Sequence, residues 1–160
     1  MPPTTPYTAD LDNREPLGAM RDTTARIRIL VSGWPPDRFD RTYAPGKWTA
    51  RQILTHLAET EMALGCRVRM ALTTSGYAAQ SFDQDSWIAK ETRTSGADAA
   101  AARFALREMN LSLFSSLSEA DRRTPFTHPE YGELTVDWVI HQMAGHDWNH
   151  LAQLETIARA

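Results

Sequence analysis

Two histidines, His146 and His150, lie four residues apart in the segment "GHDWNH" near the end of the chain. In an α-helix each residue turns by about 100°, so positions four apart lie on the same face. Two imidazoles at this spacing could chelate a divalent metal ion, but an ion bound by two histidines needs a third ligand from elsewhere. The chemistry therefore depends on which way the pair faces and on where that third ligand lies.

The pair is predicted to face the protein core. Apolar residues of the same helix follow the same face as the histidines, namely Val139, Met143, Leu154 and Ile157. Two buried imidazoles must each find a hydrogen-bond partner or a metal ion, because leaving one unpaired costs about 1–3 kcal/mol. A single buried histidine is more often an ordinary core residue than a ligand. For this pair alone, metal binding and ordinary packing remain open alternatives.

His56 is the candidate for the third ligand. It lies at the edge of the apolar face of a helix predicted over residues 50–73, beside Thr60 and Ala63, whose small side chains would leave room for an ion. It can meet the pair only if the two helices are neighbours. Three neutral imidazoles would occupy one side of a divalent ion and leave positions open for water or substrate, as catalytic metal sites require.

The other possible ligands are less well placed. His141 lies about half a turn around the helix from the pair and should face elsewhere. His128 precedes a proline in a predicted loop and is expected to be solvated. Cys66 lies ten residues after His56, about 15 Å along the helix, which is too far to share its metal. We expect Cys66 to be a small buried thiol.

Asp147 and Gln153 are candidates for supporting roles. With Asp147 directly after His146, the segment from His146 to His150 is similar to the helical zinc-protease motif, in which an acidic residue acts as general base. That base is usually glutamate, and Asp147 lies about 100° around the helix from His146. A salt bridge, on the surface or between helices, is therefore favoured over catalysis for Asp147. Gln153 shares the face of the pair and could fix a histidine tautomer, or could simply be a polar residue at the end of a bundle.

Four amphipathic helices are predicted from apolar residues at helical spacing and from capping signals such as Thr49 and Gln52, over residues 14–32, 50–73, 95–117 and 135–158. Four such helices predict an all-α four-helix bundle that forms a single domain over residues 13–160. The proline-rich residues 1–12 lack periodicity and are predicted to form a loose arm.

Two polar segments connect the predicted helices. Residues 75–94 are unusually long for a connector, and could cross the length of the bundle so that the second and third helices run parallel. Within it, Asp83, Asp85 and Trp87 are candidates for binding a cofactor or lining the substrate entrance, with a solvated crossover as the alternative. Residues 118–134 are predicted to form a loop.

Composition narrows the possible functions. The 160 residues carry 17 basic and 20 acidic side chains, for a net charge of −3, and no basic run of the kind that binds nucleic acid. The sequence shows no signal peptide and no apolar stretch long enough to span a membrane. With a single cysteine, an internal disulfide is excluded and a cytoplasmic location is expected. These features argue against a nucleic acid or a membrane as partner, and the open positions of the predicted metal site favour a small-molecule substrate.

Two segments, "GKWTARQILTHLAETE" and "GELTVDWVIHQMAGHDWNHLAQLETI", resemble the DinB/YfiT-like family of metal-dependent proteins. The resemblance covers nearly the whole chain, and the connector segment "FDQDSW" is also similar. Its specific part is the histidine near the start of the second helix, with Trp48 before it, together with the H-x-x-x-H of the fourth helix.

This resemblance implies a bundle of up-down-down-up topology, a divalent ion, zinc or nickel, on His56, His146 and His150, and a homodimer. Some members of the family use low-molecular-weight thiols such as bacillithiol, mycothiol or glutathione. We therefore expect a metal-dependent transferase that adds such a thiol to a small electrophile. Two alternatives stay open: a non-catalytic metal-binding protein related to stress, and a metal-dependent hydrolase with Asp147 or Asp83 as base.

Overall fold

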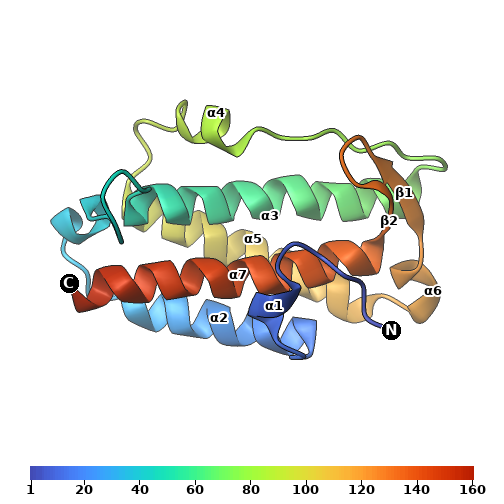
Figure 1. Ribbon diagram of the computed structural model, residues 1–160, viewed down its shortest axis with the longest axis horizontal. Helices are drawn as coiled ribbons and strands as arrows, with labels where there is room; N and C mark the ends of the chain where they lie inside the picture. The colour runs from blue at the N-terminus through green and yellow to red at the C-terminus, as the bar shows by residue number, and fades with distance from the viewer.

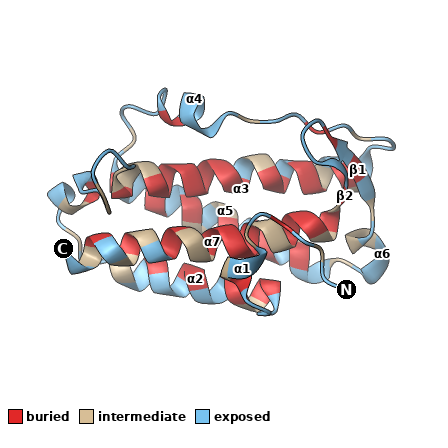
Figure 2. Cartoon of the chain, in the orientation of Figure 1, coloured by how far each residue is buried: buried red, intermediate tan, exposed pale blue.

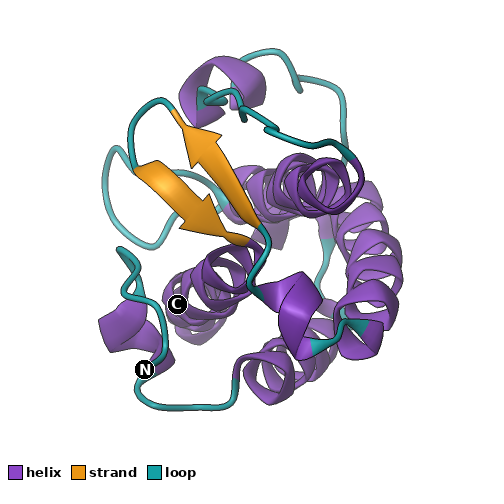
Figure 3. Cartoon of the chain, turned by 90° about the vertical axis from the view of Figure 1, so that its right-hand side faces the viewer, coloured by secondary structure: helices purple, strands orange, loops and turns teal.

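Four long helices make up most of the computed structural model, which describes residues 1–160 (Figure 1). They are α2 (Pro16–Val31), α3 (Ala50–Thr73), α5 (Gly96–Ser116) and α7 (Val136–Arg159). Viewed along the bundle, these helices are arranged around a common centre (Figure 3). The predicted all-α four-helix bundle is confirmed, and each predicted helix ends within two residues of its observed bounds.

The helices begin where side chains can pair the free backbone N–H groups of a first turn. The Thr49 hydroxyl accepts from the N–H of Gln52, and the Gln52 side chain accepts from the N–H of Thr49, which completes a capping box at the start of α3. The Ser95 hydroxyl caps α5 by accepting from the N–H of Asp98, and the Thr135 hydroxyl caps α7 by accepting from the N–H of Trp138. These local signals explain why the sequence predicted the helix starts well.

Contacts between the helices fix their directions. Arg21 of α2 donates to Ser115, and Arg28 lies over the ring of Phe104, so α2 and α5 run antiparallel. The connector of residues 74–95 then returns along the length of the bundle before α5 begins, which makes α3 and α5 parallel (Figure 1). The order is up-down-down-up, and the predicted long crossover is confirmed.

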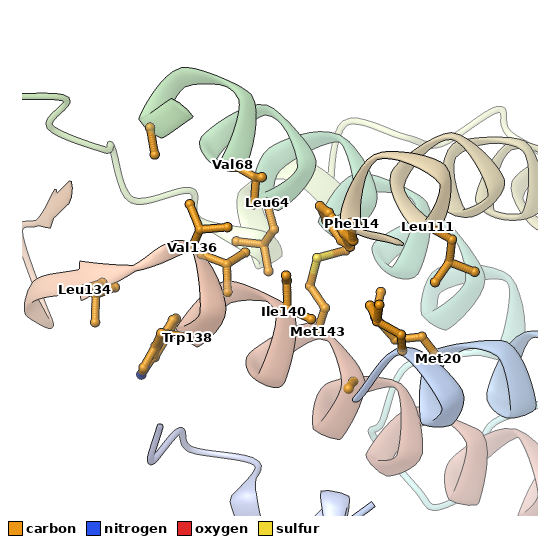
Figure 4. Packing of buried hydrophobic residues seen from close by; sticks show 14 of the residues in the cluster. Met20, Leu64, Val68, Leu111, Phe114, Leu134, Val136, Trp138, Ile140 and Met143 are labelled. Carbon is orange, nitrogen blue, oxygen red and sulfur yellow. The ribbon is translucent and has the colours of Figure 1, made fainter. Parts of the chain in front are cut away.

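Buried residues lie on the inward faces of the four helices (Figure 2). They form two apolar clusters toward opposite ends of the bundle. Figure 4 shows the larger one, in which residues of α3 and α7 meet residues of α5 and α2, among them Leu64, Val68, Ile140, Met143, Phe114 and Met20. The second contains Ile53, Leu57 and Leu154. Because apolar burial stabilises by roughly 25 cal/mol per Å², these clusters hold α3 against α7 and so position the residues between them.

The segment predicted as a loop over residues 118–134 is instead ordered, which corrects that expectation. It contains α6 (Glu119–Arg122) and an antiparallel hairpin of β1 (Pro125–His128) and β2 (Gly132–Thr135). Each strand has only four residues, too few for alternation to be recognised. Thr127 also exchanges backbone hydrogen bonds with Tyr77 and Ala79, which fastens the start of the connector to the hairpin. Short helices η1 (Pro36–Asp40) and α4 (Gln84–Ile88) complete the connections.

The first twelve residues are not the loose arm that the sequence predicted. They contain α1 (Thr8–Leu11), which packs on α7 with Leu11 buried. The indole N–H of Trp138 donates to the carbonyl of Thr4 at 2.9 Å. A Cβ added to Gly145 would lie 2.3 Å from the carbonyl oxygen of Tyr7, so glycine is what allows this close approach. No helix in the structure has the length and apolar character to cross a membrane.

Candidate metal centre

The structure brings the three predicted metal ligands together. His56 of α3 meets His146 and His150 of α7, because these two helices are neighbours in the bundle. The Nε2 atom of His146 lies 2.9 Å from Nε2 of His56 and 3.0 Å from Nε2 of His150. All three side chains are buried, with exposures of 1%, 5% and 6% for His56, His146 and His150.

This arrangement fits a bound divalent ion. Two nitrogens that each lie about 2.0–2.1 Å from one ion are separated by about 2.9 Å at a right angle and about 3.3 Å in a tetrahedron. The observed separations at His146 are close to these values. The Nδ1 atoms of His56 and His146 are buried without a hydrogen-bond partner, so ordinary hydrogen bonding does not account for the cluster. Imidazole nitrogens are suitable ligands for both zinc and nickel.

Burial keeps the three imidazoles neutral, the state in which histidine coordinates a metal. Desolvation, with a smaller contribution from His150, lowers the pKa of His56 to about 3. Burial likewise places the pKa of His146 well below its ordinary value and lowers that of His150. The ring nitrogens are therefore available as ligands at neutral pH.

Side chains around the cluster hold the imidazoles in place. Nδ1 of His150 donates to Oε1 of Gln153 at 2.9 Å, which leaves the lone pair on Nε2 facing the other two rings. This is the orienting position that the sequence offered for Gln153. The ring centroids of Trp48 and His56 lie 4.9 Å apart. The Tyr7 ring meets the His146 ring edge-on, with the centroids 5.1 Å apart.

Asp147 belongs to a buried ion-pair network and is not free to act at the cluster. Its carboxylate accepts from Arg103 at 3.0 and 3.1 Å, from Arg107 at 2.6 Å and from the Thr23 hydroxyl at 3.0 Å. Burial alone would raise the pKa of Asp147, but the two guanidinium groups lower it. Two kinds of salt bridge were predicted for Asp147, one on the surface and one between helices. The structure shows the salt bridge between helices, and it lies in the core.

The same network includes Glu61, Arg103 and Arg107, which were not predicted from the sequence as functional or structural residues. Glu61 of α3 accepts from Arg107 and from Asn110, and its carboxylate lies 3.3 Å from Arg103. All four charged side chains are almost fully buried, with two positive and two negative charges. The ion pairs among these four side chains join α3, α5 and α7 next to the histidine cluster.

Two cavities border the cluster. The first, of about 360 Å³, lies between α3 and α7 and extends from His56 and His146 to Arg67. The second, of about 370 Å³, lies against His150 and Trp48. Tyr7 and Gln84 line both cavities. Each of the three imidazoles therefore borders one of the two cavities.

The three candidate residues in the connector have different positions. Asp85 lines the second cavity. Asp83 is exposed and caps α4, where its carboxylate accepts from the backbone N–H groups of Asp85 and Ser86; hydrogen bonds from Ser86 lower its pKa. Trp87 lies outside both cavities and packs on Phe82 with the ring centroids 5.1 Å apart. Phe82 itself lines the first cavity, although it was not among the candidate residues selected from this segment.

Two further expectations are corrected. His128 is buried on the hairpin and lines the first cavity, instead of being solvated in a loop. Its Nδ1 accepts from the backbone N–H of Glu130 at 3.2 Å. Cys66, expected to be a buried thiol, is exposed and lines neither cavity, because it lies on the outward side of α3. His141 contacts Asp137 and stays away from the cluster, as expected.

Sequence comparisons match this chain to one superfamily and to relatives whose names describe metal-dependent proteins. Residues 19–154 match the DinB superfamily. A protein of Oceanobacillus iheyensis named "Putative metal-dependent hydrolase OB0413" is 27% identical over 145 residues, which cover 90% of this chain and 84% of that one. "Putative metal-dependent hydrolase YfiT" of Bacillus subtilis is 25% identical, with 88% of this chain and 80% of that one covered.

Two solved structures share the fold. The structure of YfiT from Bacillus subtilis, described as a probable metal-dependent hydrolase with an unusual four-helix bundle topology, matches with a TM-score of 0.81 and 21% identity, covering 90% of this chain and 84% of that one. A mycothiol-dependent maleylpyruvate isomerase matches with a TM-score of 0.72 and 16% identity, covering 94% of this chain and 63% of that one. At these identities the likeness shows a common fold.

Proposed function

The chain belongs to the DinB superfamily, and on that premise we propose that it is a metal-dependent enzyme that transfers a low-molecular-weight thiol to a small electrophile. One observation carries the proposal. Three neutral imidazoles from two helices point at one another, and each lines one of two neighbouring cavities that share Tyr7 and Gln84. Such a site could hold one divalent ion, zinc or nickel, with room for two reactants.

The chemistry at this site would come from the ion and the geometry from the protein. A divalent ion held by His56, His146 and His150 would deprotonate a coordinated thiol at neutral pH and so supply the nucleophile. The two cavities would hold the thiol and the electrophile on either side of the imidazoles, which raises their effective concentration. The only cysteine, Cys66, is exposed and outside both cavities, so the sulfur would come from a cosubstrate.

Hydrolysis is the second candidate, favoured by the names of the relatives. The two carboxylates that the sequence offered as general base do not serve it. Asp147 is bound by Arg103 and Arg107 in the core, and Asp83 caps α4. A purely structural ion is less well supported, because structural zinc sites usually have four protein ligands and this cluster has three.

The test is a conjugation assay with metal-loaded protein, one of the thiols bacillithiol, mycothiol or glutathione, and chlorodinitrobenzene as electrophile. A carbon–sulfur bond forms, chloride leaves with the carbon–chlorine electron pair, and the thiol proton passes to solvent. We expect conjugation that requires the metal, disappears in His150→Ala and persists in the matched control His141→Ala. Rates equal to the protein-free reaction with every thiol would contradict transfer, and metal-dependent cleavage of test esters would then favour hydrolysis.

A further inference from the structure

Three arginines are buried in the bundle, and one of them lacks a carboxylate partner. Arg103 and Arg107 form ion pairs with Glu61 and Asp147. Arg67 is only 9% exposed, and no aspartate or glutamate lies within 4.0 Å of its guanidinium nitrogens. A buried charge is costly unless it is paired, so an unpaired arginine in a folded protein calls for a ligand or an ion.

The hydrogen bonds of Arg67 leave most of its donors free. A guanidinium group has five N–H donors, and Arg67 uses one nitrogen to donate to the carbonyl of Gln80 at 2.5 Å. The group lines the first cavity together with His128. Because Nδ1 of His128 accepts from a backbone N–H, its ring proton is on Nε2, which has no hydrogen bond in the structure. Two donors therefore border the same end of this cavity.

The first cavity connects this end with the histidine cluster. On α3, residues His56, Thr60, Leu64 and Arg67 all line it, and the α-carbons of the first and last are about 16 Å apart along the helix. Side chains on a helix lean toward its N-terminus, so the long side chain of Arg67 reaches back toward His56. Between the two ends, Thr60 Oγ1 and Gln142 Oε1 are buried without hydrogen-bond partners.

We infer that the first cavity binds a small organic carboxylate, with its carboxylate group on Arg67 and its other end directed at the histidine cluster. Arginine is well matched to a carboxylate because two parallel N–H groups can bond both oxygens. A cavity of about 360 Å³ suits a small molecule. That the far end of this molecule reacts at the metal rests on the proposed function, whereas the recognition by Arg67 does not.

Glu130 is the one acidic residue that lines the cavity, and it must be considered as a competing partner. It is exposed on the hairpin and forms no ion pair with Arg67. The groups that raise the pKa of Arg67 against the effect of burial are Tyr77 and Tyr131, and no carboxylate is among them. Glu130→Gln should therefore leave carboxylate binding intact or strengthen it by removing a nearby negative charge.

The test compares benzoate with benzamide, its neutral analogue of the same shape, by isothermal titration calorimetry on metal-free and metal-loaded protein. We expect benzoate to bind at least ten-fold more tightly than benzamide in both forms. Arg67→Met should weaken benzoate by about ten- to a hundred-fold, as expected for the loss of a charged hydrogen-bonding group, and should abolish the preference. Arg69→Met is the matched control, since Arg69 lies on the same helix but bonds Gly65 and Asn110.

Equal binding of benzoate and benzamide to the wild-type protein would overturn the inference. So would benzoate binding that disappears on metal removal but tolerates Arg67→Met, because the ion itself would then be the anion site. Circular dichroism of Arg67→Met and the milder Arg67→Lys, which keeps the charge but loses the paired N–H groups, shows that any loss occurs in folded protein.

The carboxylate could belong to the electrophile or to the thiol, and glutathione and its diethyl ester separate these sources. A loss of affinity in Arg67→Met for glutathione but not for its ester places the thiol on Arg67, and unchanged glutathione affinity places the other reactant there. The benzoate comparison decides whether the carboxylate site exists, and the glutathione comparison then decides which reactant occupies it. Carboxylate preference without thiol transfer would refute the proposed function alone, and transfer without the preference would refute this inference alone.

Discussion

Nδ1 of His150 lies 2.9 Å from Oε1 of Gln153, three residues further along α7. This bond fixes the tautomer of the one cluster histidine whose Nδ1 has a partner. Replacing Gln153 with leucine should weaken metal affinity by about 10–100-fold, the usual effect of removing the partner of a histidine ligand. Gln153→Glu keeps the acceptor and should retain affinity. Competition titration with a chromophoric chelator measures both, and equal affinity in Gln153→Leu would show that the contact does not orient His150.

The buried network should be essential for stability. Asp147→Asn leaves Arg103 and Arg107 with one carboxylate, Glu61, between them. Removing one partner of a buried ion pair typically destabilises a protein by about 3–5 kcal/mol. Urea unfolding should show this loss, whereas the control Asp137→Asn, which breaks the partly exposed pair with Arg122, should lose no more than about 1 kcal/mol. A similar loss in both variants would mean that the network contributes no special stability.

Glu59 should make stability depend on pH. Burial, and then repulsion from Glu91, raises the pKa of Glu59 to about 7 from an ordinary 4.5, and its carboxylate oxygens have no hydrogen-bond partner. The folded state therefore holds the proton more tightly than the unfolded chain does. The resulting stability is fully present below pH 4.5 and is lost as the pH rises through about 7.

Glu59→Gln removes this titration. The variant should be more stable than wild type at pH 8, by on the order of 1–2 kcal/mol, and the difference should shrink by pH 5. Thermal unfolding across this range checks it. The exposed control Glu108→Gln should show no such trend, and a Glu59→Gln variant that gains nothing at pH 8 would disprove the assignment.

The approach of the N-terminal segment to α7 should depend on Gly145. In the interior of a helix, alanine is usually more stabilising than glycine by about 1 kcal/mol. Here Gly145→Ala should instead destabilise by about 1–3 kcal/mol, because the new Cβ would overlap the carbonyl of Tyr7. In a chain that lacks residues 1–11 the same substitution should be neutral or stabilising. Denaturant unfolding of the four proteins gives the comparison, and destabilisation that persists in the shortened chain would locate the clash elsewhere.

The sequence predicted well what depends on local chemistry. The helix bounds follow from capping residues such as Thr49 and Ser95, and from apolar residues at helical spacing. The convergence of His56 with the pair on α7 followed from placing all three on core-facing positions. These features can be recognised because each depends on residues within one helix, apart from the single assumption that α3 and α7 are neighbours.

What the sequence did not predict depends on contacts between distant residues. Arg103 and Arg107 lie on a buried face of α5, but charged residues on a helix are ordinarily assumed to face solvent. Their burial is explained only by Glu61 and Asp147 on two other helices. His128 was missed for the same reason, since a four-residue strand places it in the cavity.

A metal centre is tested most directly by the metal content of the purified protein, measured by plasma mass spectrometry together with zinc and nickel titrations of the metal-free form. We expect close to one divalent ion per chain. His146→Ala should lose most of this ion, while His141→Ala, on the same helix but bonded to Asp137, should retain it. Metal-free protein with no affinity for either ion, or equal loss in the two variants, would contradict a metal centre at His56, His146 and His150.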